Sequence, residues 1–255
     1  MSEDELPDAH VRRSTIHGVT LGILMLDTKF QRLPGDIGNA STWPFPVMYH
    51  VVRGATVDRV VEGQNRGLLD AFLEGAAELV RLGVSGIGTS CGFLANLHPD
   101  LVERCEVPIA TSSLLQIPMV QRLLPKRKKV GVITGSKEYL TPAHFAGVGV
   151  FDDIPVVGHP PEGMMPRNHR IGKARISYSE CEAEVLALAR RLLQENPDVG
   201  AIVSECTNFA PYSHAITRAF GVPVFDVVTM LTWFHAGLKP RDFRSAWEQI
   251  DASRS

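Results

Sequence analysis

The chain has 255 residues and a mass of 27.9 kDa, long enough to bury a substantial core without disulfides or metal ions. Hydrophobic residues make up 44% and charged residues 21%, which excludes a mainly disordered or collagen-like chain. Its 26 Lys and Arg against 28 Asp and Glu give a formal net charge of −2, so no nucleic acid and no anionic membrane is expected as a partner.

The chain lacks the sequence signals of export, membrane insertion and metal binding. No apolar stretch approaches the roughly 20 residues that a bilayer-spanning helix needs. Residues 1–16 are expected to form a flexible polar tail without a secretory signal, which predicts a cytoplasmic protein. The four cysteines contain no Cys-x-x-Cys pair, so neither a disulfide framework nor a metal site is expected. A Gly-x-Gly-x-x-Gly motif is also absent, so no motif supports binding of a dinucleotide.

Apolar runs alternate with helical patterns through the first half of the chain. Residues 29–46 interrupt this alternation and are rich in Pro and Gly, which favours a long functional loop or lid over a merely irregular connection. The patterns predict strands over residues 18–26, 49–53, 84–89 and 107–112, and helices over 60–82, 94–104 and 114–124.

The same order of elements restarts after Pro125. The patterns predict strands at 129–134, within 148–157, at 199–204 and at 223–226, and helices at 179–195, 209–220 and 229–236. Strands that are apolar on both faces and alternate with helices are typical of parallel sheets. The sequence therefore predicts an α/β protein of two similar halves, which resembles a duplication.

Two cysteines occupy equivalent places in the two halves. Cys91 and Cys206 each follow a predicted buried strand and precede a predicted helix. Ligands of parallel sheets bind outside the carboxyl ends of the strands, and a helix N-terminus stabilises a thiolate or a carboxylate. If the halves are related by pseudo-two-fold symmetry, the two thiols face each other across a cleft. One thiolate base and one thiol acid would then invert a carbon stereocentre without a cofactor.

A structural role is the alternative for each cysteine, because free cysteine commonly behaves as a small buried hydrophobe. For Cys105 and Cys181, which have no equivalent partner, the structural role is preferred. The paired placement favours a catalytic role for Cys91 and Cys206.

The segments at 88–93 (GTSCGF) and 204–208 (SECTN) resemble those of the aspartate/glutamate/hydantoin racemase superfamily. The resemblance extends over about residues 18–238. It implies two Rossmann-like domains with the active site in the cleft between them, and independence from pyridoxal phosphate and metals. The C-terminal segment would return to the first domain, which places residues 17–125 plus 225–255 in one domain and 126–224 in the other. A homodimer is expected on the same ground.

The resemblance assigns roles to individual residues. Cys91 matches the first catalytic cysteine and Cys206 the second, and this pair disfavours an arylmalonate decarboxylase, which looks like a single-cysteine member. Thr207 matches a threonine that helps to bind a substrate carboxylate. Asp27 and Thr28 stand where glutamate racemases have Asp-Ser-Gly, and a loop-capping role is the alternative for Asp27.

Departures from the family pattern disfavour glutamate and aspartate as substrates. Gly92 and Phe93 follow the first cysteine where amino-acid racemases show Asn-Thr, and Asn208 replaces a histidine. Phe93 and Phe209 would make the pocket less polar, unless they pack into the sheets.

Small polar residues at strand ends are further binding candidates. Ser113 and Ser136 could bind a carboxylate or an oxyanion through hydroxyl or backbone groups, with ordinary turn and cap usage as the alternative. Ser90, the hydroxyl neighbour of Cys91, is a further expected binding residue.

Together these features predict a cofactor-independent racemase or epimerase that inverts a stereocentre next to a carboxylate or carbonyl. The expected substrate is a small carboxylate, such as an amino acid, or a hydantoin-like molecule. Two alternatives stay open: a cis–trans isomerase of an unsaturated dicarboxylate that uses a nucleophilic cysteine, and a non-catalytic module that binds a small ligand.

Overall fold

The computed structural model describes residues 16–163, 165, 177–241, 243 and 247. The predicted tail over residues 1–16 lies outside this description, apart from residue 16. Within the described parts of the chain, no helix combines the length and the apolar content that crossing a bilayer requires.

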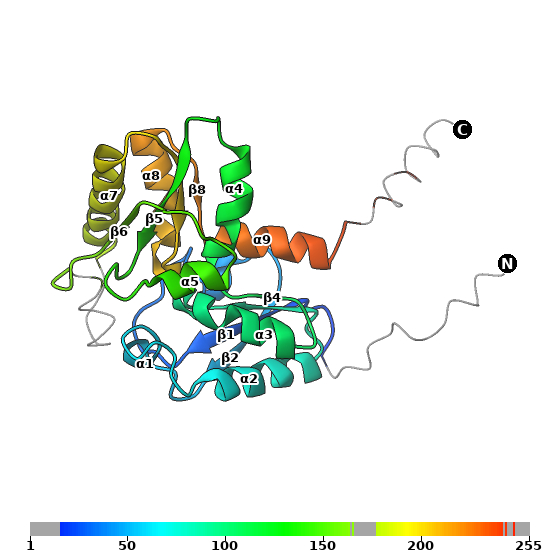
Figure 1. The fold of residues 1–255 in the computed structure, drawn as a ribbon. Coiled ribbons are helices and arrows are strands. Elements are labelled where there is room, and N and C mark those ends of the chain that lie inside the picture. The colour runs from blue at the N-terminus through cyan, green and yellow to red at the C-terminus, as the bar shows by residue number, and fades with distance from the viewer. Residues whose placement is uncertain (1–15, 164, 166–176, 242, 244–246, 248–255) are drawn as a thin grey trace, which may run out of the picture.

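Eight strands form two separate four-stranded sheets, and every strand pair in them is parallel (Figure 1). The first sheet has the order β2-β1-β3-β4, and the second has the order β6-β5-β7-β8. The bounds are β1 (Leu21–Leu26), β2 (Val47–Val52), β3 (Gly86–Thr89), β4 (Ile109–Ala110), β5 (Lys129–Thr134), β6 (Val156–Gly158), β7 (Val199–Ser204) and β8 (Val224–Phe225). The α/β fold class with parallel sheets is confirmed, and the two sheets share one strand order.

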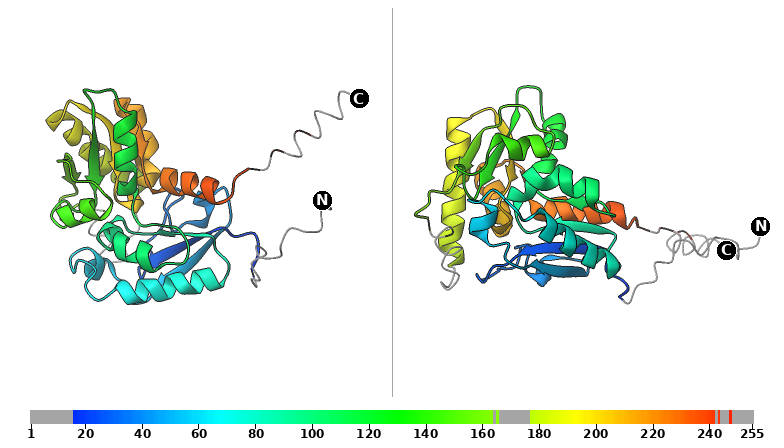
Figure 2. Two further views of the ribbon diagram at one scale, coloured as in Figure 1. Left: turned by 45° about the vertical axis from the view of Figure 1, so that its right-hand side comes forward. Right: turned by 60° about the horizontal axis from the view of Figure 1, so that its bottom comes forward.

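The central strands are buried because they are apolar on both faces. All six residues of β1 are buried between β2 and β3, with Leu21 opposite Val47 on one side and opposite Gly86 on the other. Helix α2 (Leu69–Arg81) covers this sheet, and a Cβ on Gly22 would lie 2.9 Å from Leu79. Helix α7 (Tyr178–Glu195) packs against β5, β6 and β7 of the second sheet. Each sheet with the helices packed on it is called a lobe, and Figure 2 shows α2 and α7 on the outer sides of the first and second lobes.

The predicted helix over residues 60–82 is wrong in its first third. Helix α1 (Val57–Val60) ends where the prediction begins, and a turn with positive φ at Gln64, Asn65 and Gly67 precedes α2. The cause is the buried Asn65 side chain, which donates to the Phe93 carbonyl at 3.0 Å and to the Asn96 amide oxygen at 2.7 Å. The spacing of apolar residues carries no information about these hydrogen bonds, which join the turn to the segment after β3.

The helices that follow the two cysteines begin earlier than predicted and begin as 3₁₀ turns. Helix η3 (Gly92–Leu97) leads into α3 (His98–Arg104), and η5 (Thr207–Tyr212) leads into α8 (Ser213–Phe220). After β4, η4 (Ser113–Gln116) leads in the same way into α4 (Ile117–Leu123). Within residues 29–46 lies only the short turn η2 (Ala40–Thr42), so this segment is largely a loop, as predicted.

Sequence patterns missed α5 (Pro142–Gly147), although Thr141 followed by Pro142 is a helix-start signal. Its six residues are too short to show periodicity, and it packs on η3.

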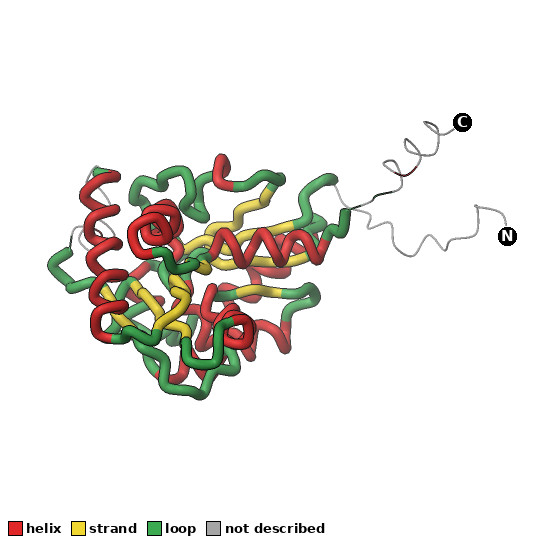
Figure 3. Tube along the Cα trace, turned by 90° about the horizontal axis from the view of Figure 1, so that it is seen from above, coloured by secondary structure: helices red, strands yellow, loops and turns green. Residues whose placement is uncertain are grey.

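Helix α9 (Val227–Leu238) leaves the second sheet and contacts β3 and β4 of the first (Figure 3). Two glycines of β3 make this approach possible. A Cβ on Gly88 would lie 2.8 Å from Leu231, and a Cβ on Gly86 would collide with Leu238. Helix α9 therefore packs directly against the backbone of β3, where the two glycines have no side chains.

Candidate active site

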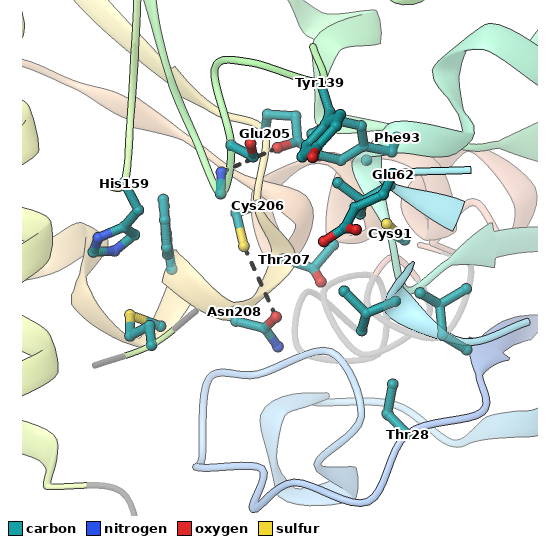
Figure 4. A pocket seen from close by; sticks show the side chains of 18 of the residues that line it. Thr28, Glu62, Cys91, Phe93, Tyr139, His159, Glu205, Cys206, Thr207 and Asn208 are labelled. Carbon is teal, nitrogen blue, oxygen red and sulfur yellow. Dashed lines mark hydrogen bonds between the residues drawn. The ribbon is translucent and has the colours of Figure 1, made fainter. Parts of the chain in front are cut away.

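One pocket lies at the carboxyl ends of β1, β3, β5 and β7, so both sheets contribute to it (Figure 4). Ligands of parallel sheets bind at this edge, as expected. Its lining consists of Leu26, Thr28, Phe30, Arg32, Val57, Asp58, Val61, Glu62, Cys91, Gly92, Phe93, Gly135, Ser136, Glu138, Tyr139, His159, Pro161, Met165, Glu205, Cys206, Thr207, Asn208 and Phe209.

Both predicted cysteines line this pocket. Cys91 caps η3 and Cys206 caps η5, each in extended backbone geometry. At this position neither sulfur makes a cap hydrogen bond, but the backbone N–H groups of Phe93 and Asn208 act to lower the pKa of Cys91 and Cys206. The chain thus presents two thiols in equivalent local settings from two different sheets.

Hydrogen bonds between the two halves fix the strand ends that carry the cysteines. The Thr207 hydroxyl donates to the Ser90 carbonyl at 2.8 Å, which joins the neighbours of the two cysteines. The Ser113 hydroxyl donates to the Ser204 carbonyl at the end of β7. Because the Thr207 proton is used in this way, its hydroxyl is left to accept rather than to donate to a substrate carboxylate.

Three predicted binding residues lie outside the pocket lining. The Ser90 hydroxyl accepts from the Leu26 backbone N–H at 2.8 Å, and Ser113 serves the interlobe bond just described. The Asp27 carboxylate accepts from the Gly54 N–H at 3.2 Å, which closes a turn. Asp27 thus has a capping role in a turn, whereas the Ser90 and Ser113 hydroxyls bond to backbone groups that lie far away in the chain. The other predicted residues, Thr28, Gly92, Phe93, Ser136, Thr207 and Asn208, line the pocket with the cysteines.

Sequence reasoning missed Glu205, the residue between β7 and Cys206. Its side chain lines the pocket although only 1% of the residue is exposed. The Thr134 hydroxyl donates to its Oε2 at 2.6 Å, and the Gly135 N–H donates at 3.4 Å. Gly92 must be glycine here, because a Cβ would lie 2.5 Å from the Glu205 carbonyl oxygen and would also meet its Oε1. An acidic residue directly after a buried apolar strand was the available signal.

Burial sets the protonation states of the site. It raises the pKa of Glu205 to about 7, because the charged carboxylate loses its hydration. Burial, reinforced by the nearby Glu205 charge, raises the pKa of Cys91 to about 12 and the pKa of Cys206 well above its ordinary value. The expected stabilisation of a thiolate by the helix start is outweighed, so both cysteines rest as thiols at neutral pH.

A polar chain links the 29–46 loop to Cys206. Arg32 pairs with Asp36 at 2.8 Å and donates to the Thr28 hydroxyl at 2.9 Å. Asp36 accepts from the Asn208 Nδ2 at 2.5 Å, which points the amide oxygen of Asn208 toward the Cys206 sulfur at 3.8 Å. The loop thus reaches the site through these contacts and adds Phe30 and Arg32 to the pocket lining.

Asp36→Ala is expected to lower the free energy of unfolding by about 3 kcal/mol, because it leaves the half-buried Arg32 guanidinium without its carboxylate. Urea denaturation measures this loss. The matched control is Glu78→Ala, which breaks an exposed ion pair with Arg81 and should leave the midpoint unchanged. Equal midpoints for the two variants would refute the assigned role of Asp36.

The rest of the lining combines rings with acidic groups. Four rings belong to Phe30, Phe93, Tyr139 and Phe209, and three further carboxylates belong to Asp58, Glu62 and Glu138. Burial lowers the pKa of His159, which keeps this imidazole neutral. Among the described residues, no group of three or more His, Cys, Asp and Glu side chains could hold a metal ion.

Solved structures with this architecture define the fold. Arylmalonate decarboxylase, in a sulfate-bound mutant form, superimposes with a TM-score of 0.59 at 16% identity, over 86% of this chain and 92% of its own. A glutamate racemase of Bacillus anthracis has a TM-score of 0.55 at 15% identity, over 87% and 83%. An allantoin racemase of Klebsiella pneumoniae has a TM-score of 0.55 at 16% identity, over 82% and 84%. The chain shares the fold of this decarboxylase and these racemases, which is the fold that the resemblance of its motifs implied.

Curated relatives in sequence carry a different activity. The dimethylsulfoniopropionate lyase of Durusdinium sp. clade D is 25% identical over 243 residues, which cover 92% of this chain and 80% of that protein. Dimethylsulfoniopropionate lyases 5 and 7 of Emiliania huxleyi are 25% and 26% identical over 85% and 86% of this chain. The chain spans 45% of the length of lyase 5 and 67% of lyase 7. No protein-family model matches the chain.

These relatives overturn the predicted racemase activity and, with it, the isomerase class. They are named as lyases, which break a bond by elimination and do not invert a centre. The error has a chemical reason. Two thiols at strand ends indicate where a proton is moved, but they do not indicate which bond changes afterwards.

Proposed function

We propose that this protein is a lyase that splits dimethylsulfoniopropionate, or a closely similar β-sulfonio carboxylate, into dimethyl sulfide and acrylate. The observation that carries the proposal is the convergence of two thiols and a buried carboxylate on one pocket between the sheets. The names of the curated relatives supply the substrate class.

The reaction needs one base and no acid. A thiolate removes a proton from the carbon next to the substrate carboxylate, and the C–H electron pair becomes the new C=C bond. The C–S pair leaves with the sulfur as neutral dimethyl sulfide, so the leaving group requires no proton. The removed proton is finally released to water, which balances the equation. A racemase would instead have to return a proton from the opposite face.

The lining suits a zwitterion with a cationic sulfur at one end. The rings of Phe93 and Tyr139 and the carboxylate of Glu62 border one side of the pocket (Figure 4). Ring faces and carboxylates both attract a cation, and a methylated sulfonium also gains from apolar contact. Arg32 is the cationic side chain in the lining and supplies the complement for the substrate carboxylate.

The test is incubation with dimethylsulfoniopropionate in sealed vials, with gas chromatography of the headspace and proton NMR of the solution. We expect dimethyl sulfide and acrylate in equal amounts. 3-(Methylthio)propionate is the matched control, because it has the same carbon chain but no sulfonium charge, and it should stay intact. Hydrogen exchange in deuterated water without release of sulfide, or no reaction at all, would overturn the proposal.

A further inference from the structure

We infer that Glu205 is the proton acceptor of this site: it takes the proton of the cysteine that becomes the base, and it passes each abstracted proton to water. The inference rests on the proposed function and assigns a role to the residue that the sequence motifs left without one. Glu205 acts through the thiols, so it is a positioning and proton-transfer group rather than a contact of the substrate.

Its place in the chain puts Glu205 beside both cysteine segments. It directly precedes Cys206, and its carboxylate lies against Gly92, the residue after Cys91. Gly135 approaches both groups, because its N–H donates to the carboxylate and a Cβ there would lie 3.5 Å from the Cys206 sulfur. Figure 4 shows the carboxylate and the two thiols bordering one space.

The carboxylate is held without a cation. Thr134 and Gly135 donate to it from the end of β5, and no ion pair reaches it among the residues that the structure describes. A buried carboxylate with neutral donors alone is easily protonated, and its pKa of about 7 keeps both forms populated at neutral pH. A group that passes protons in both directions needs this property.

Charge balance explains why a thiol needs this neighbour. Ionising a thiol into water would leave two negative charges in one buried pocket, which is costly. Moving the thiol proton to the Glu205 carboxylate instead gives a thiolate and a neutral acid, so the total charge stays constant. Cys91 and Cys206 face Glu205 from the starts of η3 and η5, and the wider lining adds the titratable and charged groups Arg32, Asp58, Glu62, Glu138 and His159.

The cycle closes in three steps. The Glu205 carboxylate takes the thiol proton, and the thiolate formed takes the substrate proton as dimethyl sulfide leaves. The cysteine is then a thiol again, and Glu205 is a carboxylic acid. Loss of that proton to water restores the starting state and accounts for the one proton that each elimination releases.

The experiment compares Glu205→Gln with the wild type in two assays across pH 5–10. The first is elimination of dimethylsulfoniopropionate, and the second is alkylation of each cysteine by iodoacetamide, resolved by mass spectrometry. Glutamine keeps an acceptor for Thr134 but cannot take a proton. We expect elimination to fall about 100-fold, because the thiol that has taken the substrate proton can no longer pass it to Glu205 between turnovers. The equilibrium fraction of thiolate should rise, because a negative neighbour is gone, so Cys91 and Cys206 should alkylate faster. In the wild type, both profiles should inflect near pH 7, and the variant should lose this inflection.

Four controls separate this role from a structural one. Cys105 serves as the alkylation reference, and the buried Cys181 reports unfolding if it becomes reactive. Glu103→Gln changes an exposed glutamate and should match the wild type in both assays. Thr134→Val removes a hydrogen bond to the ionised carboxylate and should shift the inflection to higher pH.

Unchanged or faster elimination by Glu205→Gln would overturn the inference, as would wild-type alkylation without an inflection near pH 7. If the wild type released no dimethyl sulfide, the proposed function would fail by itself. The alkylation profiles would then decide whether Glu205 controls the protons of the thiols.

Discussion

Alanine at Cys91 or Cys206 is expected to lower the elimination rate, by about 10³-fold for the cysteine that serves as base. The double variant should be no slower than the worse single variant, because groups that act in one step do not contribute additively. This pattern differs from the one expected for inversion, in which both cysteines transfer a proton, so that replacing either of them abolishes the reaction.

Headspace assays of the four proteins under substrate saturation measure this effect. Cys105→Ala is the matched control, since Cys105 lies in the connection before β4 and outside the pocket lining, and it should keep the wild-type rate. Wild-type rates in both single variants would remove the thiols from the mechanism.

The second large effect is on stability, and Glu205 causes it. Folding raises the pKa of this carboxyl from 4.5 to about 7, so the folded state holds the proton more tightly than the unfolded chain. The stabilising effect of this proton is complete below the unfolded pKa and is lost as pH rises through the folded pKa. Glu205→Gln, which cannot ionise, should therefore gain stability relative to the wild type by about 3 kcal/mol between pH 4 and pH 8.

Urea unfolding at these two pH values tests the prediction. Glu103→Gln supplies the reference for an exposed glutamate and should show the same pH dependence as the wild type. If the stability of Glu205→Gln and of the wild type changed with pH in the same way, folding would not raise the pKa of Glu205. A stabilised but slow variant would show that the site keeps Glu205 at a cost to stability.

The sequence predicted the sheets well, because continuous apolar runs such as Leu21–Leu26 have few other stable places than the centre of a parallel sheet. The same logic placed Cys91 and Cys206 in one pocket, since parallel strands end at a common edge. The apolar pattern could not predict the direction in which each side chain at this edge points. Ser90 and Ser113 stand at the predicted edge, yet their hydroxyls bond to backbone groups.

Protonation and reaction type escaped sequence reasoning for a related reason. The pKa of a thiol depends on how much water reaches it, and burial outweighs the helix start at Cys91. The importance of Glu205 follows from its contact with Gly92, which lies far away in the chain. Two thiols also serve elimination as well as inversion, so a motif shared by both cannot distinguish them.

The packing of α9 on Gly86 and Gly88 has a consequence for synthesis of the chain on the ribosome. The first sheet is complete once β4 has emerged, but the face of β3 that α9 covers stays bare until the helix ending at Leu238 is made. The first lobe of the nascent chain therefore keeps an apolar surface exposed until the whole second lobe has been translated. Ribosome-bound chains that stop before α9 should consequently recruit chaperones more strongly than chains that include it.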